Sequence, residues 1–286
     1  MADASLNPRA VYYIAKKEFA DNIRNKWVIA LTIIFVIMTL VSSYLAAGKG
    51  GGSKALGGME ETVLTLISIS SILIPIIAIM LGYATISGEA ESGSLNVLLA
   101  YPVRRTEILL GKFLGLGSVL VFSILMGFGM GGIIIIASAG TGSVLPYLGF
   151  MGFSIITGLI YLSLAMCFSS VMKKRATSLG AAIFIFFWSM IAGMVAMGIF
   201  LAQGGDLVGL VLGTEVIPNW FWAYIFISPM DMCQTSVMLA FGVKQLMGYS
   251  VEPPSFMNLW TLLFAQLVWI FVPLVLSIYS FNRRDF

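Results

Sequence analysis

Side chains that could take part in binding or catalysis are concentrated in one stretch of this chain, residues 88–112. Two carboxylates, Glu89 and Glu91, open the stretch, and the Gly93-Ser94 pair, which is typical of a turn, follows them. The chain has no His, which excludes imidazole zinc sites, Ser-His-Asp triads and His proton relays. We expect the two carboxylates to be solvated at the start of a helix, so that their contacts contribute about 1 kcal/mol or less.

Three leucines at i, i+3 and i+4 predict a short amphipathic helix over 88–101. Pro102 ends this helix, and Arg104-Arg105 follow at the level of lipid headgroups. The apolar stripe can lie on a membrane or dock into a groove of another protein. The three leucines are Leu95, Leu98 and Leu99.

Composition places this stretch in a membrane protein. The chain has 286 residues, is 59% hydrophobic and 10% charged, and has a mean hydropathy of +0.99. A soluble domain has roughly a quarter charged residues, and it could not cover its surface with fewer. The net charge of +3 is no nucleic-acid signature, so we expect no nucleic-acid partner. Cys167 and Cys233 are too few for a disulfide framework, and we expect buried thiols, although one bridge between them stays possible.

Long charge-free stretches predict an all-α membrane protein with six transmembrane helices. The apolar runs are continuous rather than alternating, and a chain in lipid must pair its backbone groups within each segment, so helices are favoured over a barrel. The predicted spans are 27–47, 62–87, 113–138, 147–171, 176–202 and 257–281.

The distribution of Lys and Arg predicts that both termini are cytoplasmic. Thirteen of these residues lie in the N-terminal segment, the 88–112 loop, the 173–175 turn and the C-terminal tail, and three lie on the other side. We therefore expect a multi-pass protein of the cell membrane, with no cleavable signal peptide.

Residues 9–26 have the pattern of an interfacial helix, an elbow that lies along the membrane surface before the first span. Asn7-Pro8 marks its start. The alternative is a simple cytoplasmic extension of the first span. The expected membrane-interface residues are Phe19, Ile23, Trp27, Arg104, Arg105 and Lys112.

The stretch 219–241 is apolar but broken by Ser228-Pro229, so each half is too short to cross a membrane. It predicts an external re-entrant helical hairpin. Ser228 matches an N-cap with Asp231 in the first turn of the second helix. The alternative is that the Asp231 carboxylate binds a cation.

The motifs of the 88–112 stretch resemble those of the ABC-2 permeases, the membrane subunits of ATP-binding-cassette exporters. Their signature is an acid, a small pair, Leu, two Leu, Pro, a basic residue and Gly-Lys. Within the family, the chain looks most like the permeases of the copper-maturation system for nitrous oxide reductase, which have segments similar to 173–178 and 227–231. The matching residues are Glu89, Glu91, Gly93-Ser94, Leu95, Leu98-Leu99, Pro102, Arg104-Arg105 and Gly111-Lys112.

The resemblance implies a homodimeric permease with two separate ATPase subunits below it. The 88–101 helix would act as the coupling helix in a cleft of the ATPase, and the 173–175 turn and the N-terminal helix would add contacts. The coupling residues so implied are Glu89, Glu91, Gly93, Ser94, Leu95, Leu98, Leu99, Lys173, Lys174 and Arg175.

The sequence also favours an energy source on a separate chain, an ATPase subunit. Gly111-Lys112 lacks the upstream Gly and the following Ser or Thr of a phosphate-binding loop, so we expect no cofactor in this chain and ATP with Mg²⁺ on the partner. The spans carry no ionisable residues for ion-coupled transport.

Besides lipids, an external accessory protein is a possible partner. The alternatives are a permease-like scaffold that transmits ATP-driven motion to an extracytoplasmic partner, and an ATPase-independent channel or carrier.

Two sets of residues are candidates for lining a pathway, since family members place spans two and five at the dimer axis. Equally, hydroxyls can bond to neighbouring helices and methionines are adaptable packing residues, so we expect no metal site although thioethers would suit Cu(I). Gly127 and Gly131 form a small-residue face for close packing on another helix. The pathway candidates are Thr65, Ser68, Ser71, Met190, Met194 and Met197.

Overall fold

The computed structural model describes residues 6–24, 26–49, 59–139, 144–212, 217–241, 245–246, 249–250 and 253–284. Within them, six helices are long and apolar enough to cross a membrane, as the charge-free stretches predict. The only strands among the described residues are the antiparallel pair β1 (Gln245–Leu246) and β2 (Tyr249–Ser250). The six long helices are α2 (Lys26–Lys49), α3 (Met59–Gly82), α6 (Arg105–Ala139), α7 (Val144–Val171), α8 (Arg175–Ala202) and α12 (Leu259–Arg283).

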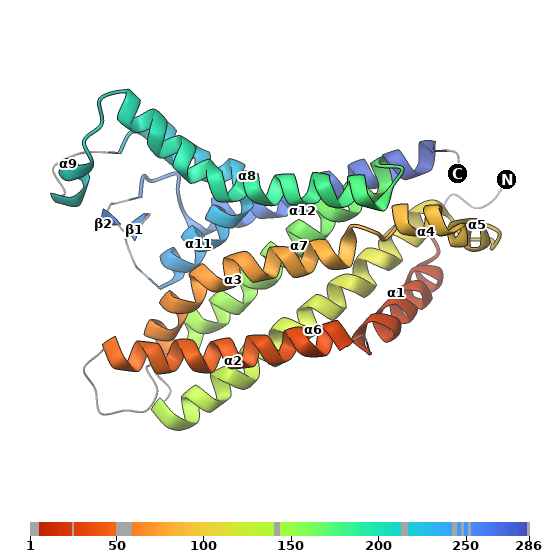
Figure 1. Ribbon diagram of the computed structural model, residues 1–286, viewed down its shortest axis with the longest axis horizontal. Coiled ribbons are helices and arrows are strands. Elements are labelled where there is room, and N and C mark those ends of the chain that lie inside the picture. The colour runs from red at the N-terminus through yellow and green to blue at the C-terminus, as the bar shows by residue number, and fades with distance from the viewer. Residues whose placement is uncertain are drawn as a thin grey trace.

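The shorter helices lie at the two ends of this bundle (Figure 1). Three of them gather near both chain termini, and we call this region, with the start of α6, the basal end. They are α1 (Pro8–Ile23), α4 (Ser87–Ser92) and α5 (Ser94–Leu99). The others lie toward the opposite end and are α9 (Leu207–Leu212), α10 (Asn219–Ala223), the 3₁₀ turn η1 (Tyr224–Ile227) and α11 (Pro229–Ala240).

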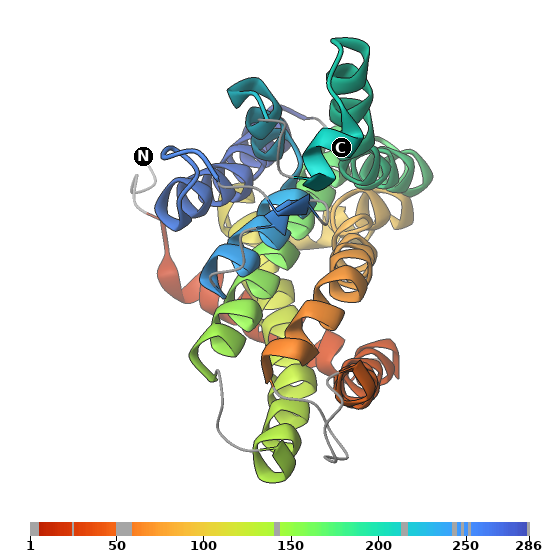
Figure 2. The same cartoon turned by 90° about the vertical axis from the view of Figure 1, so that its left-hand side faces the viewer.

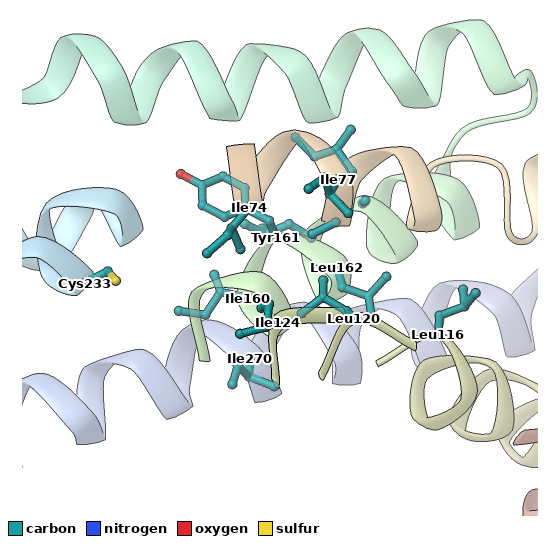
Figure 3. Close-up of a cluster of buried hydrophobic side chains, with 14 of the residues drawn as sticks. Ile74, Ile77, Leu116, Leu120, Ile124, Ile160, Tyr161, Leu162, Cys233 and Ile270 are labelled. Atoms are coloured by element: carbon teal, nitrogen blue, oxygen red, sulfur yellow. The ribbon is translucent and has the colours of Figure 1, made fainter. Parts of the chain in front are cut away.

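The core lies where α3, α6 and α12 surround α7 (Figures 2 and 3). Ile160 and Leu162 of α7 are fully buried against Ile74 of α3, Leu120 of α6 and Ile270 of α12. Lipid tails are as apolar as these side chains, so close packing rather than exclusion of water must hold such a core together.

Close packing is clearest along α6, where glycines recur at four-residue spacing. A Cβ at Gly127 would clash with Phe35, and one at Gly131 with Thr39, both on α2. The predicted small-residue face is therefore confirmed, and its partner is a helix of the same chain. This face of α6 can be approached only because these two positions carry no side chain.

Two capping predictions are confirmed. The Asn7 side chain accepts a hydrogen bond from the backbone N–H of Arg9, with Pro8 in the first turn of α1. Ser228 accepts from the N–H of Asp231 at 3.3 Å and begins α11. Both caps satisfy backbone donors that the first turn of a helix leaves free.

The two cysteines, Cys167 and Cys233, are free and buried, so the predicted buried thiols are confirmed.

Helix α6 begins at Arg105, whereas the predicted span begins at 113. The prediction followed the charge-free stretch, but charges do not end a helix when the protein itself pairs them. Glu107 is buried and accepts hydrogen bonds from the backbone N–H groups of Asn7 at 2.8 Å and Arg104 at 2.9 Å. One carboxylate thus ties the start of α1 to the start of α6.

Candidate functional site

The predicted single helix over 88–101 is two short helices, α4 and α5, joined at Gly93. This residue has φ +74°, a left-handed conformation that side chains rarely adopt, and a Cβ there would meet nothing within 4 Å. Backbone conformation, rather than space, therefore favours glycine at this joint. The hydroxyls of Ser92 and Ser94 hydrogen-bond across it at 2.9 Å.

The leucine stripe does not lie on the surface as one unit. Leu95 is 1% exposed and packs in the core of the bundle, while Leu98 is half-buried against it. The side chain of Leu99 is not among those the structure describes. Among the described side chains of α5 and its end, the large apolar ones that are exposed are Val97 and Tyr101, at 66% and 64%. Sequence reasoning missed this pair, although its i, i+4 spacing was a usable signal.

Lys112 is 2% exposed, so it is not the membrane-interface residue that its position predicts. Its Nζ lies 2.8 Å from Oε1 of Glu18 on α1 and 2.7 Å from Oε1 of Glu89 on α4. Glu89 is therefore paired, and the prediction of a solvated carboxylate is wrong for it. Sequence reasoning missed Glu18 altogether, because nothing local relates it to a lysine 94 positions away.

Glu91 behaves as a surface carboxylate. Its Oε2 lies 2.8 Å from Nε of Arg175, and both side chains are well exposed. This pair joins α4 to the start of α8, so the structure brings the 173–175 turn next to the 88–101 segment. Lys173 and Lys174 are exposed beside it.

Two other basal arginines, Arg105 and Arg284, bind helix ends. The guanidinium of Arg105 donates to the carbonyl oxygens of Phe281 at 2.9 Å and Asn282 at 3.4 Å, at the end of α12. Arg284 donates to the carbonyl oxygen of Ser170 at 2.9 Å, at the end of α7. Cations at helix C-termini satisfy free carbonyls and favour the helix dipole. The membrane contacts expected of Arg104 and Arg105 stay a prediction.

A groove of about 340 Å³ opens at the basal end between α1 and the α4–α5 segment. Its surface is mostly apolar, but Lys17, Ser94 and the ion pairs of Lys112 form part of its lining. The second carboxylate oxygen of Glu89, Oε2, is buried there and has no hydrogen-bond partner among the described residues. The wall residues include Ile14 and Lys17 of α1, Val97 and Leu98 of α5, and Tyr101.

Helix α1 occupies the range expected for the elbow. Phe19 is half-buried and meets Phe122 of α6 edge to face, with ring centroids 6.3 Å apart. Ile23 is also half-buried, and the side chain of Trp27 is outside the described set. The helix has no fully buried residue, as suits a surface element. Its place at a membrane interface stays a prediction.

The hydroxyl candidates for a pathway do not share one surface. Thr65 donates to the carbonyl oxygen of Ser42 on α2, at 3.4 Å. Ser71 is buried and accepts from Nε2 of Gln234 on α11 at 3.2 Å. Ser68 is exposed. The hydroxyls of Thr65 and Ser71 therefore join helices of the same chain, which is the packing role weighed for them.

The methionine candidates lie along α8. Met194 is 72% exposed, while Met190 and Met197 are half-buried. Met194 lies on a broad apolar face of α8 that the described residues leave uncovered, with exposed Phe184, Phe187, Trp188 and Ile191.

Comparison with known proteins gives this arrangement a family. A family profile described as "ABC-2 family transporter protein" matches residues 12–286. Two relatives, each described as a probable ABC transporter permease protein NosY, match nearly end to end. The Pseudomonas aeruginosa protein is 31% identical, with 96% of this chain and 98% of the relative covered. The Stutzerimonas stutzeri protein is 29% identical, with the same shares of 96% and 98%. With its six membrane helices, the chain is a multi-pass protein of the plasma membrane, and it belongs to the ABC-2 family of transporters.

Proposed function

We propose that this chain is the permease subunit of an ABC exporter and that it receives force through its basal end. The observation that carries the proposal is the α4–α5 segment, which follows α3, leads into α6 and exposes Val97 and Tyr101. Apolar side chains exposed on a short, anchored helix form a surface that a partner protein can cover. The basal end faces the cytoplasm, where ATP is available.

The nucleotide belongs to the partner. Two ATPase subunits bind one permease dimer, and each holds ATP and Mg²⁺, while this chain supplies no cofactor. The family assignment supports association with an ABC ATPase, and the absence of a phosphate-binding loop from the sequence supports hydrolysis on a separate chain. Coupling residues around Val97 then transmit motion into α3 and α6, because the segment is continuous with both.

The test is a charge placed on the exposed part of α5. Val97→Asp should reduce co-purification of the ATPase at least tenfold without loss of membrane insertion, because a carboxylate would be buried in the interface. Leu145→Asp is the matched control, since Leu145 is an exposed apolar residue at the far end of α7. Equal ATPase recovery with Val97→Asp and the unchanged chain would contradict the docking role.

Sidedness gives a second test of the same proposal. Asn96→Cys places a thiol on the exposed surface of α5, whereas Cys167 and Cys233 are buried. A membrane-impermeant maleimide should label this thiol in inside-out vesicles and not in intact cells. Labelling from the cell exterior would place the segment on the wrong side for an ATPase and refute the proposal.

A further inference from the structure

The Gly111-Lys112 pair is a signature that the proposed function does not explain, and its surroundings are unusual. A Cβ at Gly111 would lie 2.7 Å from Cβ of Ile14, and one at Gly115 would lie 2.6 Å from Cβ of Glu18. Both distances are too short for real side chains, so α1 reaches α6 only because these positions are glycines. The approach brings the Glu18 carboxylate to the Lys112 ammonium.

Lys112 connects three separate pieces of the basal end. It belongs to α6, and its ammonium binds Glu18 of α1 and Glu89 of α4 at 2.8 and 2.7 Å. Its side chain is 3% exposed, against 16% for Glu18 and 30% for Glu89. Charge-assisted hydrogen bonds of this length, shielded from water, are stronger and more directional than surface ion pairs.

The start of α4 is fixed on α7, where the backbone N–H groups of Ile86 and Ser87 donate to the hydroxyl of Ser169 at 2.9 and 3.0 Å, and the rest of the α4–α5 segment has fewer fixed points. A four-residue turn over 83–86 precedes α4, and Gly93 separates α4 from α5. Leu95 anchors α5 by packing, and the Glu91–Arg175 pair is exposed to water, which weakens it. The Lys112–Glu89 pair is a less exposed ion pair that holds the segment to α6.

We propose that Lys112 is a positioning residue that locks α1 and the α4–α5 segment onto α6, so that the three move as one body. The inference rests on the proposed function, because the ATPase supplies the motion. Force applied at α5 then reaches α6 and α1 together instead of bending the joint at Gly93. Glu18 and Glu89 are the two arms of this lock.

The experiment measures one distance in the full permease–ATPase complex in lipid nanodiscs. Spin labels at Tyr13→Cys on α1 and Asn96→Cys on α5 report whether these helices move relative to each other, and both residues are exposed. In dimers in which only one protomer carries the two labels, and in the otherwise unchanged chain, the label distance should be single and narrow, and it should be the same with and without ATP.

The decisive variant removes the charges together. Lys112→Met with Glu18→Gln and Glu89→Gln leaves no unpaired buried charge, so the permease should still fold, which elution as a single species checks. We expect the width of the Tyr13–Asn96 distance distribution to at least double and the distance to depend on ATP. Lys112→Met alone should widen it too, with a loss of stability that the triple variant does not share.

Two outcomes would overturn the lock. One is a distance that changes with ATP in the unchanged chain, which would show that α1 and α5 move separately. The other is a folded triple variant with the original narrow distance. If no ATPase binds the unchanged chain, the proposed function fails, and the lock is judged by the same comparison of widths in the permease alone.

Discussion

At the scale of single residues, the basal end contains carboxylates of two kinds. Glu107 is buried and holds two backbone N–H groups that begin different helices, while Glu91 meets Arg175 at the surface. Water solvates each charge of a surface ion pair almost as well as the opposite charge does, so losing the pair costs little. A buried acceptor cannot be removed without leaving its hydrogen-bond donors unsatisfied. Burial therefore decides which carboxylate matters to the fold.

This contrast predicts different stabilities for two alanine variants. Glu107→Ala should lower the free energy of unfolding by about 1–3 kcal/mol, the usual cost of removing one partner of buried hydrogen bonds. Glu91→Ala should leave the thermal midpoint of the permease nearly unchanged. Thermal unfolding of the purified variants in the same detergent measures both, and an equal loss for the two variants would contradict the assignment.

Residue-level prediction from the sequence succeeded where the cause is local. The caps at Asn7 and Ser228 depend on residues within three positions, so their pattern can be read directly. The pairing of Lys112 depends on how far α1 and α4 fold back across α6, and no periodicity encodes that. Lys112 was therefore placed among the headgroups, whereas it is buried in the protein.

At the scale of elements, α6 is the helix on which the N-terminal half of the chain is assembled. Glycines at 111 and 115 admit α1, and glycines at 127 and 131 admit α2, all on one four-residue repeat. In a membrane, small residues allow the close contacts that replace the hydrophobic effect. Each four-residue step turns by about 40° around the helix axis, so the two glycine pairs lie on different sides of α6 and fix α1 and α2 separately.

Two alanine substitutions on α6 should distinguish the effect of packing on stability from the effect of helix propensity. Gly127→Ala adds a methyl that clashes with Phe35, and overpacking of this kind costs about 1–3 kcal/mol. Gly129→Ala is the control, because its Cβ would meet only Met151 Cε at 3.8 Å, an ordinary contact. The thermal midpoint should fall for the first and hold or rise for the second. A similar fall for both would show that the clash with Phe35 is not the cause of the lost stability.

The sequence predicted the long elements correctly as helices, but it was less accurate on where each helix ends and which of its sides is buried. Apolar stretches gave the six long helices because lipid excludes unpaired charges, yet the protein's own pairing of Glu107 and Lys112 let α6 begin at Arg105. The leucine spacing gave a helix near 94–99, but spacing alone cannot tell which face a neighbouring bundle will cover. Leu95 is thus inside and Val97 outside.

At the scale of the whole molecule, the uncovered face of α8 points to the second permease of a dimer. Its exposed aromatic and aliphatic residues run from Phe184 to Met194, and the resemblance to the family implies that spans two and five meet at the dimer axis. Exposed Ser68 and Met80 lie on α3, which contacts α8. We propose that these two helices form the homodimer interface.

Disulfide cross-linking in native membranes checks this arrangement. Met194→Cys should form a covalent dimer on mild oxidation, because its copies would lie close together across the axis. Phe264→Cys on α12 is equally exposed, at 70% against 72%, and should stay monomeric. Cross-linking through Phe264→Cys but not through Met194→Cys would move the interface to α12.

The lysine at 112 also has a consequence for synthesis. Both of its acidic partners, Glu18 and Glu89, come earlier in the chain, so each is translated before the residue that neutralises it. Since chains emerge from the ribosome N-terminus first, α1 and α4 are made before Lys112, and their two acids have no lysine partner until then. The three-way contact at Lys112 can close only after the start of α6 has been synthesised, when the first two long helices are already made.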